Sequence, residues 1–163
     1  MYLAVRGRRR GSTGPKDLLL PEVIDRVLST PSLISGLIEE RLRYDSPLQL
    51  LFRRATEDCE IAGTRIPASA SITLWLGSAN RDERQFDDPD RFDPSRGTKG
   101  NLAFGFGIHH CLGAALARLE ARAVFEALLP ALGPLKRANG SSKFVDSFMV
   151  RGLHRLELKR LSA

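Results

Sequence analysis

One short segment contains most of the residue types in this sequence that could do chemistry. It reads Phe104-Gly105-Phe106-Gly107-Ile108-His109-His110-Cys111-Leu112-Gly113. Its glycines allow backbone turns that other residues avoid, and they let a flat ligand approach the main chain. Cys111 lies where an Ala-rich helix is expected to begin, and helix N-terminal amides favour a thiolate. A thiolate fixed in such a loop is suited to be the axial ligand of a metal.

The cysteines allow two other interpretations. A lone cysteine usually behaves as a small buried hydrophobe, and this suits Cys59, which has no motif around it. A zinc site is disfavoured because the spacing contains neither a C-x-x-C pair nor an H-x-x-x-H pair. Such a site would have to combine the two cysteines with His109, His110 and His154.

Charged residues at helical spacing form a second group of candidates. Glu40 and Arg43 are three residues apart, so on a helix they share a face and can bond to each other. Arg118 and Arg122 are four residues apart and also share a face. Without further context, a pair such as Glu40 and Arg43 is far more often a solvated surface pair, and a solvated helix face is as good an interpretation of Arg118 and Arg122.

The glycine-rich segment resembles the haem-binding loop of the cytochrome P450 family, Phe-x-x-Gly-x-(His/Arg)-x-Cys-x-Gly, and every fixed position is matched. The resemblance implies that Cys111 is the proximal thiolate ligand of haem b. It places Phe104 beside that ligand and pairs His109 with a haem propionate. Gly107 and Gly113 would provide clearance for the backbone.

Further segments resemble the same family in the same order. Glu40 and Arg43 match its Glu-x-x-Arg pair, and Arg91 in Asp88-Pro89-Asp90-Arg91-Phe92 would complete a structural charge network behind the loop. Arg53 matches an arginine that reaches a haem propionate, since its fork suits a carboxylate. By the same resemblance the apolar residues that would line a substrate pocket are Leu48, Leu50, Phe52, Met149 and Val150.

The implied function is that of a haem-thiolate monooxygenase, which inserts one oxygen atom into an apolar organic substrate. Electrons would come from NAD(P)H through a ferredoxin-type donor, for which Arg118 and Arg122 are possible contacts. The resemblance covers about residues 20–160 and only the C-terminal part of the family's fold. Nothing here matches the long helix that crosses the distal haem face. The alternative is therefore a truncated, catalytically inactive remnant that at most binds haem.

Composition is consistent with a globular, cytoplasmic protein. The 163 residues are 42% hydrophobic and 27% charged, and two cysteines cannot form a disulfide framework. No apolar run is long enough to span a membrane. The net charge of +6 is concentrated at the N-terminus, where residues 1–16 contain five basic residues and no acid. No nucleic-acid motif accompanies them, so we expect residues 1–19 to be a poorly ordered basic segment.

The remaining residues, 20–163, are predicted to form a mainly α-helical fold with small β-sheets, an α+β arrangement. Apolar spacing predicts a helix from Pro21 to about Leu28 and a second from about Pro31 to before Pro47. Short strands are expected within 60–67 and 71–76, followed by an irregular meander over 83–101. After the Cys111 loop, the longest helix is predicted over 112–129, closed by Pro130, with strands at 148–150 and 156–158.

Overall fold

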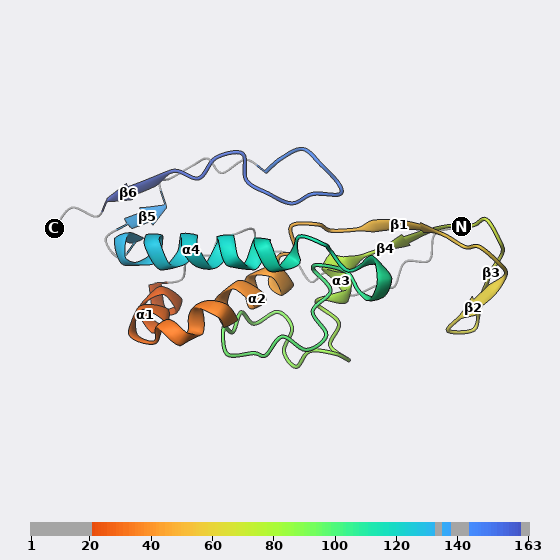
Figure 1. Ribbon diagram of the computed structural model, residues 1–163, viewed down its shortest axis with the longest axis horizontal. Helices are drawn as coiled ribbons and strands as arrows, with labels where there is room; N and C mark the ends of the chain where they lie inside the picture. The colour runs from red at the N-terminus through yellow and green to blue at the C-terminus, as the bar shows by residue number, and fades with distance from the viewer. Residues whose placement is uncertain (1–20, 133–134, 138–143, 161–163) are drawn as a thin grey trace.

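The computed structural model describes residues 21–132, 135–137 and 144–160, and Figure 1 shows how their elements are arranged. The predicted basic segment, residues 1–19, lies outside the described residues. Helices dominate, and the strands form three separate two-stranded antiparallel sheets. The predicted arrangement of helices with small sheets is therefore confirmed.

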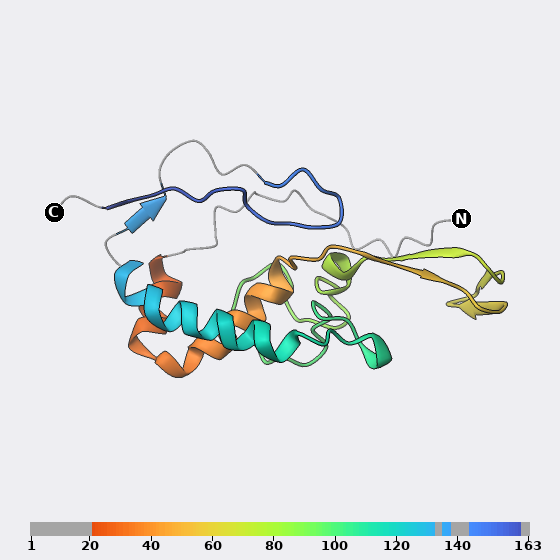
Figure 2. The same cartoon turned by 45° about the horizontal axis from the view of Figure 1, so that its top comes forward.

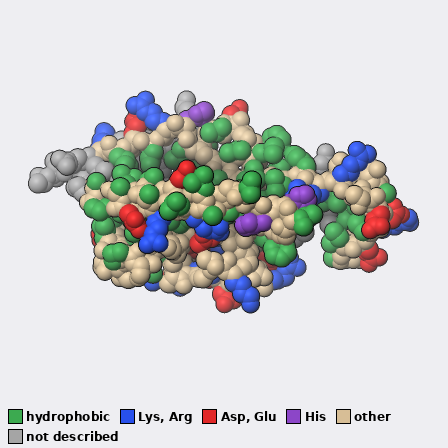
Figure 3. Space-filling view, in the orientation of Figure 1, with side chains coloured by type: hydrophobic (Ala, Val, Ile, Leu, Met, Phe, Trp, Pro, Cys, Tyr) green, Lys and Arg blue, Asp and Glu red, His purple; other side chains and the backbone are tan. Residues whose placement is uncertain are grey.

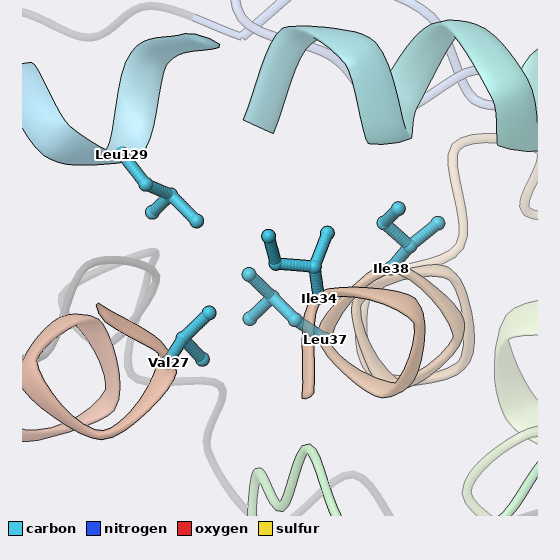
Figure 4. Close-up of a cluster of buried hydrophobic side chains, with 5 residues drawn as sticks. All are labelled: Val27, Ile34, Leu37, Ile38 and Leu129. Atoms are coloured by element: carbon cyan, nitrogen blue, oxygen red, sulfur yellow. The ribbon is translucent and has the colours of Figure 1, made fainter. Parts of the chain in front are cut away.

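Three helices build the core. They are α1 (Pro21–Ser29), α2 (Ile34–Tyr44), which follows the 3-10 turn η1 (Pro31–Leu33), and α4 (Ala114–Leu132). Pro31 opens the 3-10 turn, where its missing N–H has no cost. The apolar stripes predicted from the sequence meet here, with α4 lying across α2 and α1 (Figures 1 and 4). The buried cluster consists of Val27, Ile34, Leu37, Ile38 and Leu129.

The first four strands form an arm that extends from this helical body (Figure 2). β1 (Leu51–Arg54) pairs with β4 (Ser71–Leu74), in a register that sets Arg53 opposite Ile72. At the tip, β2 (Cys59–Ile61) and β3 (Thr64–Ile66) form a hairpin. Its two-residue turn is Ala62-Gly63, and both residues have positive φ, as a type I′ turn requires.

An irregular stretch joins the arm to α4, as predicted. After the short helix α3 (Leu76–Ala79), the chain contains only turns and bends until the 3-10 turn η2 (Gly107–His109). Asp82 and Asp93 stabilise turns within it, because their carboxylates accept the backbone N–H two residues ahead. This meander packs against α2 so closely that a Cβ on Gly36 would lie 2.0 Å from the carbonyl oxygen of Pro94.

Two predictions about the C-terminal third are wrong. α4 does not stop before Pro130 but continues to Leu132, because a proline in the last turn removes one hydrogen bond without unwinding the helix. Residues 148–150 form no strand; Val150 makes an isolated bridge to Leu48, and the sheet at this end pairs β5 (Leu135–Arg137) with β6 (Leu158–Arg160). Of the described helices, none has the length and apolarity needed to cross a membrane.

Candidate functional site

Backbone hydrogen bonds give the Cys111 loop a defined shape. The amide of Cys111 donates to the carbonyl of Phe104 over 2.9 Å, so the two ends of the loop are tied together. Between them Gly105 and Gly107 have φ of 74° and 66°, values at which a side chain is strained. The carbonyl of Cys111 in turn accepts the amide of Ala114, the first residue of α4. The predicted placement of Cys111 just before the helix N-terminus is thus what the structure shows.

The thiol of Cys111 is exposed and stands among exposed apolar side chains. Ile108 and Leu112 are essentially fully exposed, and Phe106 is 83% exposed. Green apolar atoms accordingly surface over much of the molecule in Figure 3. A Cβ on Gly113 would lie 4.0 Å from the Cys111 sulfur, so a larger side chain there would crowd the space beside the thiol. An open thiol with an apolar rim suits a broad, flat, apolar ligand.

The two side chains predicted to bind a haem propionate come from different elements. His109 closes η2 and is exposed, whereas the adjacent His110 places Nδ1 3.4 Å from the carbonyl oxygen of Gly105. Arg53 lies on β1, and its Nη1 donates to the carbonyl of Phe52 over 2.8 Å. Among the described residues, neither side chain is held in a buried ion pair.

Behind the loop, Glu40 and Arg43 form the predicted pair, and it is buried. Each side chain is only 2% exposed. Arg43 donates through Nε and Nη2 to the two carboxylate oxygens of Glu40, over 2.7 and 2.8 Å. Its Nη1 donates to the carbonyl of Asn80 over 2.7 Å. Arg43 therefore joins α2 to the residue that follows α3.

The third arginine of this network is Arg96 and not Arg91. Nε of Arg96 lies 3.3 Å from Oε1 of Glu40, whereas the Arg91 side chain is 66% exposed and stands 3.6 Å from Asp93. Arg91 contributes its carbonyl oxygen, which accepts from both Arg43 and Arg96. The chain turns back at Asp93, whose carboxylate caps Ser95, and this turn brings the Arg96 side chain toward α2.

Sequence reasoning missed a second polar connection, centred on Asn80. Its side chain is fully buried; Nδ2 donates to the hydroxyl of Ser46 and Oδ1 accepts the amide of Leu102 over 2.7 Å. A nearby link joins Asn101 to the carbonyl of Glu39 over 3.1 Å. No motif in the sequence marks Asn80, because its partners lie far from it along the chain.

The two arginines of α4 have different surroundings. Arg118 pairs with Glu39 of α2, and the carboxylate raises the pKa of this guanidinium above its ordinary value. Its guanidinium carbon also lies 4.6 Å from the centre of the Phe104 ring. Arg122 pairs only with Glu126 one turn further along the helix, and both of these side chains are about half exposed.

The predicted substrate-lining segments come together. Leu48 bridges Val150, and the amide of Gln49 donates to the carbonyl of Met149 over 2.7 Å. Phe52 and Val150 are about half exposed, but Leu50 is 2% exposed and belongs to the protein interior. Within the described part of the chain, no three His, Cys, Asp or Glu residues cluster closely enough to hold a metal ion.

Comparison with known proteins gives one family throughout. The cytochrome P450 family model matches residues 30–132. Cytochrome p450 CYP199A2 of Rhodopseudomonas palustris is 41% identical over 138 residues, which are 80% of this chain and 34% of that protein. Erythromycin C-12 hydroxylase of Saccharopolyspora erythraea is 46% identical over 113 residues, 68% of this chain and 28% of that protein. The chain thus spans about a third of the length of the curated relatives it matches.

Solved structures agree. The P450BioI structure in complex with an acyl carrier protein matches with a TM-score of 0.83 and 39% identity, over 88% of this chain and 37% of that one. CYP109E1 from Bacillus megaterium, in complex with testosterone, matches with a TM-score of 0.82 and 36% identity. The match covers 85% of this chain and 39% of that one. The helices, small sheets and Cys111 loop described above are part of the P450 fold, and the chain belongs to the cytochrome P450 family.

Proposed function

We propose that this chain forms the haem-binding C-terminal part of a P450 monooxygenase, with Cys111 as the thiolate ligand of haem b. The observation that supports this most directly is the exposed Cys111 thiol, set before the N-terminus of α4 and surrounded by apolar side chains. Positive φ at Gly105 and Gly107 keeps side chains away from the surface that the macrocycle would cover. These features fit a large, flat, apolar group with an axial sulfur ligand.

Haem bound through a thiolate supplies the oxygen-activating chemistry of the family. This chain's own residues would hold and orient it. Cys111 provides the sulfur, and the bond from its amide to Phe104 sets the position of that sulfur. Arg53 and His109 would bind the propionates, while Leu112 and Phe106 would cover the apolar part of the macrocycle.

A carbon monoxide spectrum tests the ligand assignment. The reduced, haem-loaded chain should show the strongly red-shifted Soret band that a thiolate ligand produces. Cys111→Ser should abolish that band. Cys59→Ser is the matched control, because it removes the other exposed thiol from a hairpin far along the chain, and it should leave the band unchanged. A normal Soret position in the folded wild-type chain would refute the assignment.

The proposed propionate contacts have a separate test. Arg53→Ala and His109→Ala should each speed the transfer of haem to apomyoglobin while the thiolate spectrum persists. A charge-assisted hydrogen bond shielded from water stabilises by about 1.5–3 kcal/mol, which corresponds to roughly ten- to hundredfold faster loss. Arg54→Ala, one position along β1 and exposed, is the control. Unchanged rates in both variants would mean that Arg53 and His109 only face solvent.

We propose an apolar organic substrate for the complete enzyme. The joined segments around Leu48 and Val150 present Phe52 and Val150 half exposed. The related structures bind a hexadecenoic acid carried on a protein and testosterone, which are both largely apolar. Electrons would reach the haem from NAD(P)H through an acidic ferredoxin-type donor, and Arg122 is the α4 arginine free enough to meet it.

The second candidate function is haem binding without turnover by these 163 residues alone. It is favoured because nothing in this sequence matches the long helix that crosses the distal haem face, whereas oxygen activation needs a site that excludes water. The two candidates differ in one measurable quantity, which is product formed per NAD(P)H consumed.

A further inference from the structure

Arg118 links α2 to the Cys111 loop, because it contacts both Glu39 on α2 and Phe104 at the start of the loop. Its guanidinium forms a two-point pair with Glu39, in which Nη2 lies 3.2 Å from Oε2 and Nε donates to Oε1. The same guanidinium covers the ring of Phe104, with 4.6 Å from its carbon to the ring centre. Because Glu39 belongs to α2 and is 9% exposed, the arginine is held from a rigid element.

Phe104 passes this restraint directly to Cys111. The carbonyl of Phe104 accepts the Cys111 amide over 2.9 Å, so a shift of Phe104 moves the backbone that carries the sulfur. Glu39 also restrains the backbone just before Phe104, because its carbonyl accepts a hydrogen bond from Nδ2 of Asn101. Glu39 and Arg118 thus clamp the residues 101–104 between α2 and α4.

We infer that Arg118 is a positioning residue for the thiolate ligand, which acts through Phe104 and is oriented by Glu39. This inference rests on the proposed function in one respect, namely that Cys111 is the haem ligand. It assigns Arg118 a role different from docking an electron donor. A guanidinium engaged by a carboxylate on one side and by an aromatic ring below has little freedom to form a new ion pair.

Arg122 provides the comparison within the same helix. It lies one turn from Arg118, has the same charge, and pairs with an exposed carboxylate. Replacing either arginine by glutamine removes one positive charge from α4. Only the replacement at position 118 removes a contact to the loop, so the two variants separate positioning from surface charge.

Hydrogen exchange on the haem-free 163-residue chain tests the clamp. In Arg118→Gln the amides of residues 102–111 should exchange roughly ten- to hundredfold faster, which corresponds to the loss of a charge-assisted restraint. The amides of α1, which packs in the core through Val27, should keep their rates, which shows that the chain has not lost its fold. Arg122→Gln should leave both regions unchanged. Arg118→Lys, which keeps the charge but loses the planar fork, should resemble Arg118→Gln.

A double-mutant cycle tests whether Arg118 acts through Phe104. Phe104→Leu alone should also speed exchange of the Cys111 amide, and the combined variant should show much less than the product of the two single effects. Loop exchange that is unchanged in Arg118→Gln would overturn the inference, as would multiplicative effects in the double mutant. If α1 also exchanges faster, the milder Glu39→Gln variant decides, since it should loosen the loop alone.

The spectrum of the loaded chain supplies a second readout. Arg118→Gln should lower the proportion of the red-shifted carbon monoxide band relative to the normal one, and Arg122→Gln should not. Failure of the haem proposal would appear as no red-shifted band in any variant. Failure of the positioning inference would appear as the same band and the same loop exchange in Arg118→Gln as in the wild type.

Discussion

Glu40 is one carboxylate that serves two guanidinium groups and a backbone amide. Arg43 and Arg96 donate to it, and so does the N–H of Asp93 over 2.9 Å. All of these bonds form in a place where the Glu40 side chain is 2% exposed. A buried charge of this kind is stable only while its partners stay in position, because little water can replace them.

Arg43→Met should therefore destabilise the chain strongly. The substitution leaves the Glu40 carboxylate buried without its two-point partner, and we expect a loss of about 3–5 kcal/mol in the free energy of unfolding. Urea denaturation followed by circular dichroism measures it. Arg91→Ala is the control, since this side chain is mostly exposed and should change stability by no more than about 0.5 kcal/mol. Equal effects of the two substitutions would contradict the assignment of the network.

The ion pair between Asp82 and Arg84 should make the stability of the folded chain depend on pH in the acid range. The guanidinium of Arg84, assisted by the Arg84 backbone amide, lowers the pKa of Asp82 to about 2. In the unfolded chain the pKa of an Asp is about 3.9. The stabilisation from the lowered pKa of Asp82 is therefore present above about pH 4 and is lost as the pH falls to about 2. A carboxyl NMR titration should give the low value, and Arg84→Ala should raise the pKa toward the ordinary one. An ordinary pKa in the wild-type chain would refute the contact.

At the scale of elements, α2 and the meander approach each other through a glycine. Gly36 lies in the first turn of α2, and a Cβ there would stand 2.0 Å from the carbonyl oxygen of Pro94. That oxygen belongs to the turn that carries Asp93 and Arg96 to Glu40. The close contact of helix and turn is thus a condition for assembling the charge network.

Gly36→Ala should destabilise the chain although alanine is the better helix former. Alanine gains about 0.8–1.0 kcal/mol in helix propensity, but the clash with backbone should cost more, about 1–3 kcal/mol beyond that gain. Gly97→Ala provides the control in the same meander, because nothing lies within 4 Å of its Cβ position. Thermal unfolding compares the two. A more stable Gly36→Ala variant would show that the meander can move away from α2.

At the scale of the whole molecule, one side of the Cys111 loop and of α4 is apolar and uncovered by the described residues. On α4, more than half of the surface is exposed for Leu116, Leu119 and Val124. The apolar side chains of the loop, Phe106, Ile108 and Leu112, are exposed as well. Exposed apolar surface of this extent marks a surface that associates with other protein. We expect the isolated 163-residue chain to bind the dye ANS and to self-associate.

The isolated chain also leads to a prediction about turnover. Given a competent ferredoxin system and NAD(P)H, the isolated chain should hydroxylate apolar test substrates no faster than free haemin. The reason is that nothing in this sequence matches the helix that crosses the distal haem face, so the oxygen-binding side of a bound haem would not be shielded from water. Product that tracks NAD(P)H consumption and disappears in Cys111→Ala would contradict this. It would show that these residues suffice for a working monooxygenase.

Local patterns in the sequence determined a large part of this protein. The spacing of glycines and Cys111 identified the family, and the apolar periodicity located α1, α2 and most of α4, because these signals depend on neighbouring residues. The pairing of Glu40 with Arg43 was also predictable, since side chains three residues apart lie next to each other on one face of a helix. The C-terminal end of α4 could not be predicted from Pro130, because a proline ends a helix only where packing does not continue the helix past it.

Only the tertiary structure decided which distant groups meet. Arg91 and Arg96 are five residues apart in an irregular segment, and the turn at Asp93 selects Arg96 to reach Glu40. Asn80 and Arg118 have no motif that foretells their partners, which lie 22 residues along the chain for Asn80 and 79 for Arg118. Contacts of this kind depend on how helices and turns pack in three dimensions, so the loop that holds Cys111 could be recognised from the sequence, whereas the residues that clamp it could not.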